Sequence, residues 1–516
     1  MNVAVKPAAK IAYSAQQSAV IDWTLRGWGS ALVRARAGTG KTFLLLACLP
    51  HMRGGVGIAA FNNKIAKEIG AKVNEKGLSA DVKTFHAFGF GAWRKVAPQV
   101  KIEGKGSKNA GYLKIDRILQ EVQVPEHLVA FVRKAMSYAK QRGIGIFTQI
   151  DHKKAWNDIV DHYDLGELFE GEDREYDDFI REGINAAIAC LKVSNSLSKE
   201  VIDFDDMLYM PLLLNVRFWQ YDWLLVDEAQ DTNPVRREMA KRLLKRGGRA
   251  IFVGDDRQAI YGFTGADNDS LDIIKETFKT QEFPLTVTYR CAKAVVSQAQ
   301  ALVPDYQAAD HNPVGEVEII REEDFDAKTL VPTDAIICRN TKPLVVTAFQ
   351  LIRAGVPCHV EGRDIGAGLL ALASRWKSVK SLAKLKERLE LYFEKETAKL
   401  IKQEREHAIG PLEDKVETLK ALINFVGIDK TTDELRERIE SMFADTPEGT
   451  KIDRVTLLTA HRSKGLEYKR VFLWGVNKYM PSPYAKQAWQ AQQEENLEYV
   501  AITRAMETLV YVEVEK

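Results

Sequence analysis

Eight consecutive residues near the N-terminus carry the clearest chemistry in this sequence. The segment Ala35–Thr42 follows an apolar run, Ala31–Val33, and leads into a helical pattern at Phe43–Ala47. Glycines in such a loop let consecutive backbone N–H groups point at phosphate oxygens, and the helix start adds partial positive charge. Lys41 would reach the β- and γ-phosphates, and the Thr42 hydroxyl could bind Mg²⁺. We expect a nucleoside triphosphate site with these residues in contact: Ala37, Gly38, Thr39, Gly40, Lys41 and Thr42.

Two adjacent carboxylates follow a second apolar run much later in the chain. Trp223–Val226 is typical of a buried strand, and Asp227 and Glu228 come directly after it. Asp227 suits Mg²⁺ binding, and Glu228 suits orienting and deprotonating an attacking water. A surface turn would give the same pair. The combination with the phosphate loop therefore carries the prediction of phosphoryl-transfer chemistry.

The composition limits the class of protein. The 516 residues suffice for several domains, and 73 basic residues nearly cancel 71 acidic ones, so a nucleic-acid partner would need a local groove. Five cysteines without paired spacing favour a reducing compartment and argue against a zinc site. No apolar run is long enough to span a bilayer, and the N-terminus lacks a signal-peptide pattern. We expect a cytoplasmic protein with no membrane partner.

Short apolar strands, each followed by a polar or glycine-containing loop, must position these residues. They recur at Val56–Ala60, Ala250–Val253, Ala335–Cys338, Val455–Leu458 and Val471–Trp474. The strands alternate with helical patterns. Such alternation is typical of parallel sheets in α/β layers, whose strand C-termini carry the chemistry.

Two regions interrupt this alternation and have helical patterns. In residues 93–200, apolar side chains with the spacing of one helix face run from Leu128 to Ala139. In residues 366–446, two apolar stripes among many charges precede Thr431, which has capping-box spacing to Glu434. We interpret the charges as solvated helix surface. The sequence thus predicts two α/β bodies, each with a helical insertion.

The order of the motifs adds a resemblance to a known family. The segment Asp227–Asp231 resembles motif II of the UvrD/Rep-like superfamily 1A DNA helicases. The match runs from near residue 12 to near residue 508. The other segments that resemble family motifs, in chain order, are Gln16, Phe61–Lys64, Thr84–Phe88, Gly254–Phe263, Thr288–Arg290, Thr459–Glu467 and Glu498–Ala505.

The resemblance implies two RecA-like P-loop domains with parallel sheets, each carrying a helical insertion. ATP and Mg²⁺ would bind between these domains, and hydrolysis would drive 3′–5′ movement along single-stranded DNA and unwinding of duplex. The implied boundaries are 1–92 with 201–281 for the first domain, 93–200 for its insertion, 282–365 with 447–516 for the second domain, and 366–446 for the short second insertion.

The resemblance also implies roles at the nucleotide. Gln16 would read the adenine, Tyr289 would stack on the base, and Glu467 would join the nucleotide contacts. Gln258 would sense the γ-phosphate, and two arginines would act as arginine fingers on the transferring phosphoryl group. The residues implied for catalysis are Lys41, Glu228, Gln258, Arg290 and Arg504.

For the single strand, the resemblance implies stacking of bases on aromatic faces, worth about 1–3 kcal/mol per base. Core packing is the competing interpretation for Phe61 and Phe263, and a packed, hydrogen-bonded ring is the competing interpretation for His86 and His461. Phe204–Asp206 also resembles a family element, and a helix cap explains it equally well. The implied DNA-binding residues are Phe61, Asn62, Thr84, His86, Tyr261, Phe263 and His461.

Several departures from the family pattern leave alternatives open. Ala35 replaces a glycine, and Arg36 replaces a small residue, so Arg36 could point to solvent or add charge near the nucleotide. Phe263 stands where tryptophan is usual, and the insertion at 366–446 is shorter than in larger members. We therefore weigh a helicase against a translocase that needs a partner to unwind, a nucleotide-gated binding module and an RNA-directed motor. The expected partners are single-stranded DNA, single-strand/duplex junctions and replication or repair proteins, with the chain itself a monomer.

Overall fold

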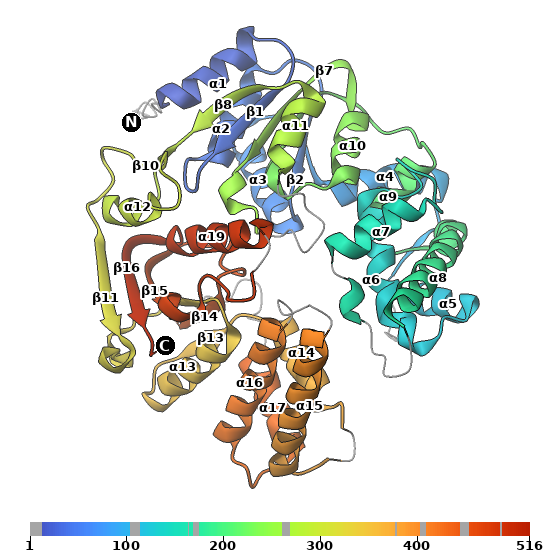
Figure 1. Ribbon diagram of the computed structural model, residues 1–516. Helices are drawn as coiled ribbons and strands as arrows, with labels where there is room; N and C mark the ends of the chain where they lie inside the picture. The colour runs from blue at the N-terminus through green and yellow to red at the C-terminus, as the bar shows by residue number, and fades with distance from the viewer. Residues whose placement is uncertain are drawn as a thin grey trace, which may run out of the picture. The chain divides into compact units, whose positions relative to one another are not determined.

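The computed structural model describes residues 13–103, 114–163, 165–168, 175–260, 269–376, 379–402, 409–443, 454–485 and 488–515. The chain divides into two compact units. Unit 1 comprises Met1–Asp256 and Tyr261–Leu285, and unit 2 comprises Arg257–Ile260 and Thr286–Lys516. Each unit contains a six-stranded parallel sheet with helices around it (Figure 1). The predicted α/β fold class with two parallel sheets is confirmed.

The sheet of unit 1 has the strand order β3-β2-β6-β7-β1-β8. Its strands are β1 (Ala31–Ala35), β2 (Val56–Ala60), β3 (Asp81–Thr84), β6 (Tyr221–Val226), β7 (Leu244–Gly254) and β8 (Gln281–Leu285). The surrounding helices are α1 (Ala15–Arg26), α2 (Lys41–Cys48), α3 (Asn63–Glu75), α4 (Phe85–Val96), α10 (Pro234–Leu243) and α11 (Ser270–Phe278). Because all the strands run parallel, the phosphate loop after β1 and the carboxylates after β6 lie at the same edge of the sheet.

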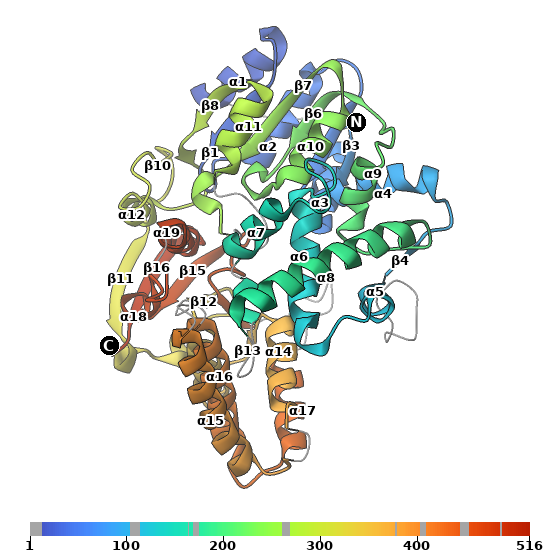
Figure 2. The ribbon, with the colours of Figure 1, turned by 45° about the vertical axis from the view of Figure 1, so that its right-hand side comes forward.

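A helical part of unit 1 lies between β3 and β6 in the chain. It contains α5 (Lys114–Val122), α6 (Glu126–Arg142), α7 (Lys153–His162), α8 (Tyr176–Ser196), α9 (Asp206–Leu213) and the strand pair β4 (Lys101–Ile102) and β5 (Val201–Ile202). The helices α6 and α8 pack side by side (Figure 2). Phe131 of α6 and Phe179 of α8 meet edge to face with ring centroids 5.4 Å apart, inside a core that also buries Trp93 and Trp156. The predicted apolar face from Leu128 to Ala139 is buried in this core.

The sheet of unit 2 has the strand order β11-β16-β15-β12-β14-β13. Its strands are β11 (Glu316–Arg321), β12 (Ala335–Cys338), β13 (Cys358–Val360), β14 (Val455–Thr459), β15 (Tyr468–Trp474) and β16 (Ala505–Glu513). A separate pair is formed by β9 (Val287–Thr288) and β10 (Gln307–Ala308). The helices beside the sheet are α12 (Lys293–Ala299), α13 (Thr341–Arg353), α18 (Val476–Tyr479) and α19 (Ala488–Ile502).

Four further helices of unit 2 share a hydrophobic core with one face of its sheet. They are α14 (Arg363–Ala373), α15 (Leu382–Lys402), α16 (Ile409–Val426) and α17 (Thr432–Met442). Leu382, Leu385 and Leu389 are fully buried, as the apolar stripe predicts. The capping box between Thr431 and Glu434 is also confirmed.

No helix in the parts of the chain that the structure describes is both long and apolar enough to cross a membrane.

Candidate functional site

The phosphate loop joins the end of β1 to the start of α2. Gly38 and Gly40 have φ values of 68° and 83°, a left-handed backbone that residues with a Cβ rarely adopt. The Thr39 hydroxyl donates to the Arg36 carbonyl at 2.9 Å and closes the loop. The loop therefore has a defined shape, with Lys41 as the first residue of α2.

A glutamine of α1 that sequence reasoning missed, Gln17, supports this loop. Gln17 is 3% exposed and donates from Nε2 to the Thr39 carbonyl at 3.3 Å. Gln17 also completes a capping box with Ser14, which fixes the start of α1. The Ser14–Gln17 spacing is a sequence signal for the helix start, and it does not reveal the contact with Thr39. Gln16 is half-buried beside it, and its adenine contact stays a prediction.

The phosphate-loop lysine pairs with the second carboxylate of the Asp227-Glu228 pair. Lys41 Nζ lies 3.0 Å from Glu228 Oε1. Burial alone would lower the pKa of Lys41, but the charges of Glu228, Asp255 and Asp227 outweigh burial and raise it above its ordinary value. Burial, together with the adjacent Glu228, raises the pKa of Asp227 to about 6. The structure thus brings the predicted lysine and both predicted carboxylates together.

Gln230 links these groups to the end of β7, a role that sequence reasoning missed. Its Nε2 donates to Glu228 Oε2, so both oxygens of Glu228 are engaged. Its Oε1 accepts from the Asp255 backbone N–H at 3.0 Å. Gln230 lies in the segment that resembles motif II, but only the order of β6 and β7 in the sheet shows that it faces Asp255.

Arg36 points back into the unit. Its Nη1 lies 2.9 Å from Asp256 Oδ1 and 3.3 Å from Asp255 Oδ1, and the residue is only 8% exposed. Asp255 is fully buried, so the arginine supplies a cation to a carboxylate that has no access to water. Of the two alternatives for Arg36, exposure to solvent is wrong.

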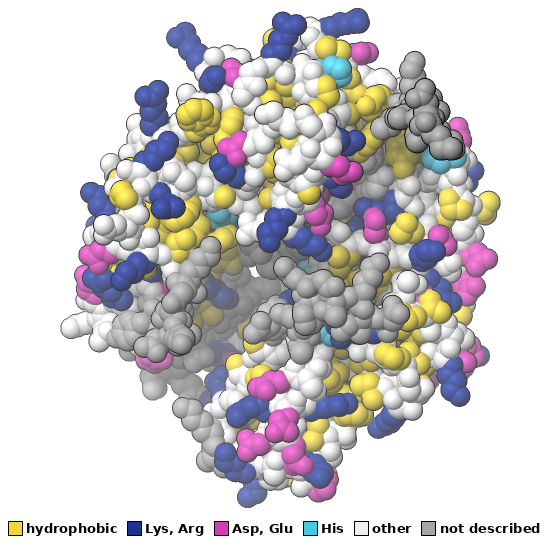
Figure 3. All heavy atoms as spheres, turned by 180° about the vertical axis from the view of Figure 1, so that it is seen from behind, with side chains coloured by type: hydrophobic (Ala, Val, Ile, Leu, Met, Phe, Trp, Pro, Cys, Tyr) yellow, Lys and Arg dark blue, Asp and Glu magenta, His cyan; other side chains and the backbone are white. Residues whose placement is uncertain are grey.

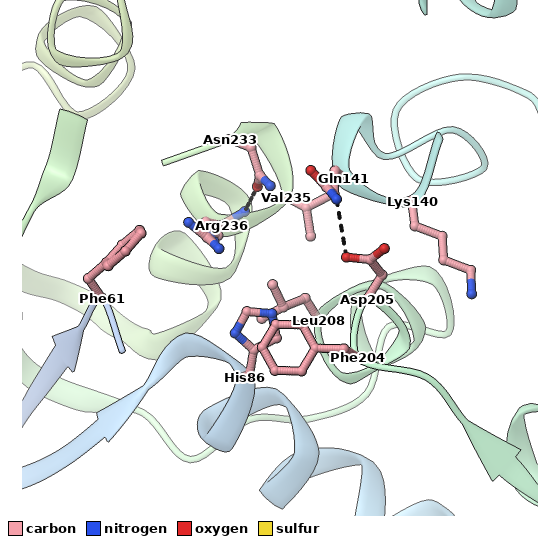
Figure 4. Close-up of a pocket in the computed structure, with 10 residues that line it drawn as sticks. All are labelled: Phe61, His86, Lys140, Gln141, Phe204, Asp205, Leu208, Asn233, Val235 and Arg236. Atoms are coloured by element: carbon pink, nitrogen blue, oxygen red, sulfur yellow. Dashed lines mark hydrogen bonds between the residues drawn. The ribbon is translucent and has the colours of Figure 1, made fainter. Parts of the chain in front are cut away.

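A pocket of about 310 Å³ opens beside the C-terminal ends of β2 and β3 (Figure 4). Phe61 lines one side of it, and the Arg236 guanidinium lies 5.7 Å from the centroid of the Phe61 ring. On the other side His86 stacks on Phe204 with ring centroids 3.7 Å apart. Burial, with the nearby charge of Arg236, lowers the pKa of His86 to about 3, so this ring is neutral. Phe204 is 62% exposed and offers an accessible aromatic face.

The rest of this pocket is held by a buried ionic network. Asp205 accepts hydrogen bonds from Ser137 at 2.5 Å and from Gln141 at 3.3 Å and makes no capping bond to α9. The helix-cap explanation does fit Asp206, because its N–H donates to Asp203 Oδ1 at 2.8 Å and its carboxylate accepts from the Asp203 N–H at 3.0 Å. Asp206 pairs with Lys114 at 2.5 Å and with Lys140 at 2.7 Å, and all three side chains are almost completely buried. Together these contacts tie the start of α9 to α5 and α6.

Two predicted DNA-binding side chains cap helices beside the pocket. Asn62 Oδ1 accepts from the Ile65 N–H at 2.9 Å at the start of α3. Thr84 Oγ1 accepts from the Ala87 N–H at 3.2 Å at the start of α4. These caps position the neighbouring residues that line the pocket, and a direct contact with a strand stays a prediction. Tyr261 and Phe263 lie outside the described residues.

In unit 2, the two predicted arginine fingers lie close to the motif that contains Glu467. Arg290 Nε is 2.7 Å from Glu467 Oε2. Arg504 is 1% exposed and donates to the carbonyls of Val500 at 2.8 Å and Leu466 at 3.0 Å. Burial, with the charge of Arg290, lowers the pKa of Arg504 to about 10.

Three further predicted residues of unit 2 have different surroundings. Tyr289 is 41% exposed and stacks loosely on His311, with ring centroids 5.9 Å apart. The backbone carbonyl of Gln258 accepts from Lys464 Nζ at 2.7 Å. His461 lines a pocket of about 540 Å³, and burial, with the charge of Arg339, lowers its pKa to about 3.

Comparison with known proteins gives one consistent family. A model of the UvrD/REP helicase N-terminal domain matches residues 14–279, and a model of the UvrD-like helicase C-terminal domain matches residues 374–516. An ATP-dependent DNA helicase Rep from Salmonella typhimurium is 27% identical over 298 residues, which cover 53% of this chain and 41% of that protein. A probable DNA helicase II homolog from Mycoplasma genitalium is 27% identical over 433 residues, which cover 65% and 61% respectively.

An ATP-dependent DNA helicase PcrA from Leuconostoc citreum is 26% identical over 297 residues, 53% of this chain and 37% of that protein. The chain spans about half the length of the curated relatives that it matches. The N-terminal family model alone covers more than half of the chain and includes the phosphate loop and the paired carboxylates. It also includes the pocket in which His86 stacks on Phe204, which we call the stacked pocket. The chain belongs to the UvrD/Rep helicase family.

Proposed function

We propose that this protein is an ATP-dependent DNA helicase that moves along single-stranded DNA. The observation that carries the proposal is the contact of Lys41 with Glu228 beside the buried Asp227. A phosphate-binding lysine and two carboxylates in contact are the set that hydrolysis of a nucleoside triphosphate requires. The names of the relatives, which are ATP-dependent DNA helicases, support ATP and DNA as substrates.

Mg²⁺ fits the chemistry of the donor set. Mg²⁺ is usually bound through one or two carboxylates together with substrate phosphates and waters, so few protein ligands suffice. Asp227 and Thr42 would hold it, and the adjacent Glu228 adds a second negative charge that a divalent cation would neutralise. When bound, the ion would neutralise developing charge on the phosphates.

Glu228 is the proposed base for the attacking water. Its contact with Lys41 would give way when phosphates take the lysine, because three phosphate oxygens compete with one carboxylate. Gln230 would then keep hold of Glu228 Oε2 and fix its direction. We propose Arg290 and Arg504 as the arginines that stabilise charge on the transferring phosphoryl group, with Gln258 as γ-phosphate sensor. Gln16, Tyr289 and Glu467 complete the proposed nucleotide contacts.

The stacked pocket is the proposed path of the single strand. Phe204 offers an exposed ring that His86 supports from behind, and Arg236 adds a cation near Phe61. Stacking on ring faces is tolerant of sequence, as a motor requires, and the neutral His86 makes the contact independent of pH near neutrality. We also propose that the protein moves along the strand in the 3′–5′ direction and acts as a monomer, and both proposals rest on the family resemblance.

A translocase that needs a partner to open duplex is the second candidate. It is favoured by the small size of the helical group α14–α17, which corresponds to the short insertion of the sequence prediction. Both candidates require hydrolysis, whereas a nucleotide-gated binding module does not.

ATP hydrolysis with and without oligo(dT), compared between the wild type and Glu228→Gln, tests the proposal. We expect strong stimulation by DNA in the wild type and none in the variant. Stimulation by an RNA strand of equal length, but not by DNA, would reassign the substrate. Hydrolysis that DNA leaves unchanged would contradict the motor function.

A further inference from the structure

The side of the sheet at which the strands of unit 1 begin carries a second set of exposed aromatic and basic side chains. We call this side of the sheet the opposite edge. All six strands are parallel, so their N-terminal ends lie together, away from the phosphate loop and the stacked pocket. The exposed side chains there include four arginines and two tryptophans, which we call the N-terminal row and which lie beside the exposed Gln220 and Lys245: Arg26, Trp28, Arg53, Arg217, Trp219 and Arg246.

Four residues of the N-terminal row, one at the start of each of four adjacent strands, alternate between cation and ring, and Arg26 and Arg217 each lie two residues before one of the tryptophans in the chain. Arg53 comes just before β2, Trp219 just before β6, Arg246 near the start of β7, and Trp28 just before β1. These four strands are adjacent in the order β2-β6-β7-β1. Neighbouring strands lie about 4.8 Å apart, so the row extends about 15 Å along the edge.

The two tryptophans of the row are unusually accessible. Trp28 is 88% exposed and Trp219 is 71% exposed, whereas Trp93 and Trp156 of the same unit are fully buried. Indole rings have a large apolar surface. Two exposed indoles at one side of a sheet therefore indicate a surface that binds a partner.

The arginines of the row are exposed and make no ion pairs among the described residues. Among the residues that the structure describes, none of the four is ion-paired or hydrogen-bonded through its side chain. The main carboxylate at this edge, Asp222, is already taken by Lys245 at 2.8 Å and by the Gly55 N–H at 2.7 Å. Asp22 of α1 is an exposed neighbour of opposite charge. Lys and Arg side chains project along the upper margin of the space-filling view (Figure 3).

Arg249 fixes the loop that carries Trp28. Arg249 lies between Trp23 and Trp223, with its guanidinium carbon 4.3 Å and 4.2 Å from their rings. It also donates to the carbonyls of Trp23, Thr24 and Gly29, each at 3.1 Å. The loop that presents Trp28 is therefore anchored to the start of β7.

We propose that the N-terminal row is a second binding surface for single-stranded DNA. The arginines would contact successive phosphates, and the two indoles would stack on bases between them. Tryptophan and arginine are also enriched in protein interfaces, but alternation of charge and ring along a line suits a linear polyanion better than a folded partner. The surface lies at the other edge of the sheet from the nucleotide residues, so the inference does not depend on the proposed motor function.

The test uses photo-crosslinking of the full chain, without nucleotide, to oligo(dT) carrying 5-iodouracil. We expect crosslinked peptides that contain Trp28 and Trp219, in addition to peptides from the stacked pocket. A Trp28→Ala/Trp219→Ala variant should lose the crosslinks at the N-terminal row and keep those at the stacked pocket. Its ATP hydrolysis without DNA should equal that of the wild type. The loss of both rings should weaken binding at this surface by about tenfold or more.

Salt dependence gives a second readout that a folding defect would not mimic. In Arg53→Gln/Arg246→Gln, the slope of log Kd against log salt should fall by about 1 to 1.5, because two phosphate contacts are lost. The matched control is Arg181→Gln/Lys192→Gln, which removes the same charge from α8 and should leave the slope unchanged.

Two results would overturn the proposal. One is the absence of crosslinks at both tryptophans together with an unchanged slope in Arg53→Gln/Arg246→Gln. The other is binding of poly-glutamate, lost in the tryptophan variant, without any DNA crosslink at the row, which would identify an acidic protein as the partner. Failure of the motor function alone would appear as missing DNA-stimulated hydrolysis with the crosslinks intact.

Discussion

Lys41 Nζ and Glu228 Oε1 lie 3.0 Å apart, so the proposed phosphate-binding lysine and the proposed base neutralise each other's charge. Gln230 holds the other oxygen of Glu228. A nucleotide bound as we propose would replace one of the two partners of Glu228 and leave the second in place. The proposed function would then couple occupancy of the phosphate loop to release of the base.

Glu228→Gln separates the role of this carboxylate as a proton acceptor from its role as the ion-pair partner of Lys41. We expect kcat for ATP hydrolysis to fall by at least about 100-fold, because the amide cannot accept the proton of water. The affinity for a non-hydrolysable ATP analogue should be equal or higher, because Lys41 is no longer paired with a carboxylate. Glu238→Gln, in a surface pair with Arg242 on α10, is the control and should match the wild type in both. Weaker analogue binding by Glu228→Gln would argue against the competition between Glu228 and phosphate.

Gln230→Leu tests the positioning of the base. The change removes the bond to Glu228 and leaves the Asp255 N–H without its acceptor. We expect kcat to fall about 10- to 100-fold with little change in KM, since misplaced catalytic groups cost rate more than ground-state binding. In Gln230→Glu, a second carboxylate beside Glu228 should also shift the acid limb of the pH–rate profile to higher pH. A profile that stays in place would show that Gln230 does not act through Glu228.

Arg36→Ala should destabilise unit 1. The change removes the Arg36 cation from the fully buried Asp255, and breaking a buried ion pair in this way typically costs about 3–5 kcal/mol. Urea unfolding monitored by intrinsic fluorescence measures the loss. Arg36→Ala/Asp255→Asn should regain most of it, because the amide tolerates burial without a counter-charge. A loss below about 0.5 kcal/mol in the single variant would mean that Asp255 is stabilised by other groups.

The buried His86 predicts a stability loss on acidification. Its pKa is lowered to about 3 in the folded chain, whereas an unfolded histidine titrates near 6.5. Between these values the unfolded state binds more protons, so the free energy of unfolding falls as the pH decreases through about 6.5. From pH 7.5 to 5.5 this group should contribute about 1 kcal/mol to the loss. His86→Gln should therefore lose less stability than the wild type over that interval, and an equal loss would show that His86 is protonated in the folded state.

The sequence predicted those parts of the fold and site that local spacing encodes. The phosphate loop with its flanking strand and helix, the strand before Asp227 and the capping box at Thr431 all depend on residues a few positions apart. The same holds for the stripe of Leu382, Leu385 and Leu389, which the structure buries. The assigned domain boundaries and the roles of the site residues remain predictions.

The contacts that sequence reasoning missed join segments that only the sheet order brings together. Arg36 and Asp255 are far apart in the chain and meet because β1 and β7 are neighbours. Gln17 of α1 donates to the Thr39 carbonyl, a contact between a helix and the loop after β1 that residue spacing does not reveal. Asp206 makes the local cap-type bonds with Asp203 that its position allows, but its ion pairs with Lys114 and Lys140 join it to two other helices, and residue spacing does not reveal them.

The most direct test of the motor function is strand displacement on matched duplexes with a 3′ or a 5′ single-stranded tail, with ATP hydrolysis followed in the same tubes. We predict DNA-stimulated hydrolysis and displacement from the 3′-tailed duplex alone. Stimulated hydrolysis without displacement would favour the translocase that needs a partner. ATP hydrolysis that is stimulated by neither the 3′-tailed nor the 5′-tailed duplex would contradict the proposed motor function.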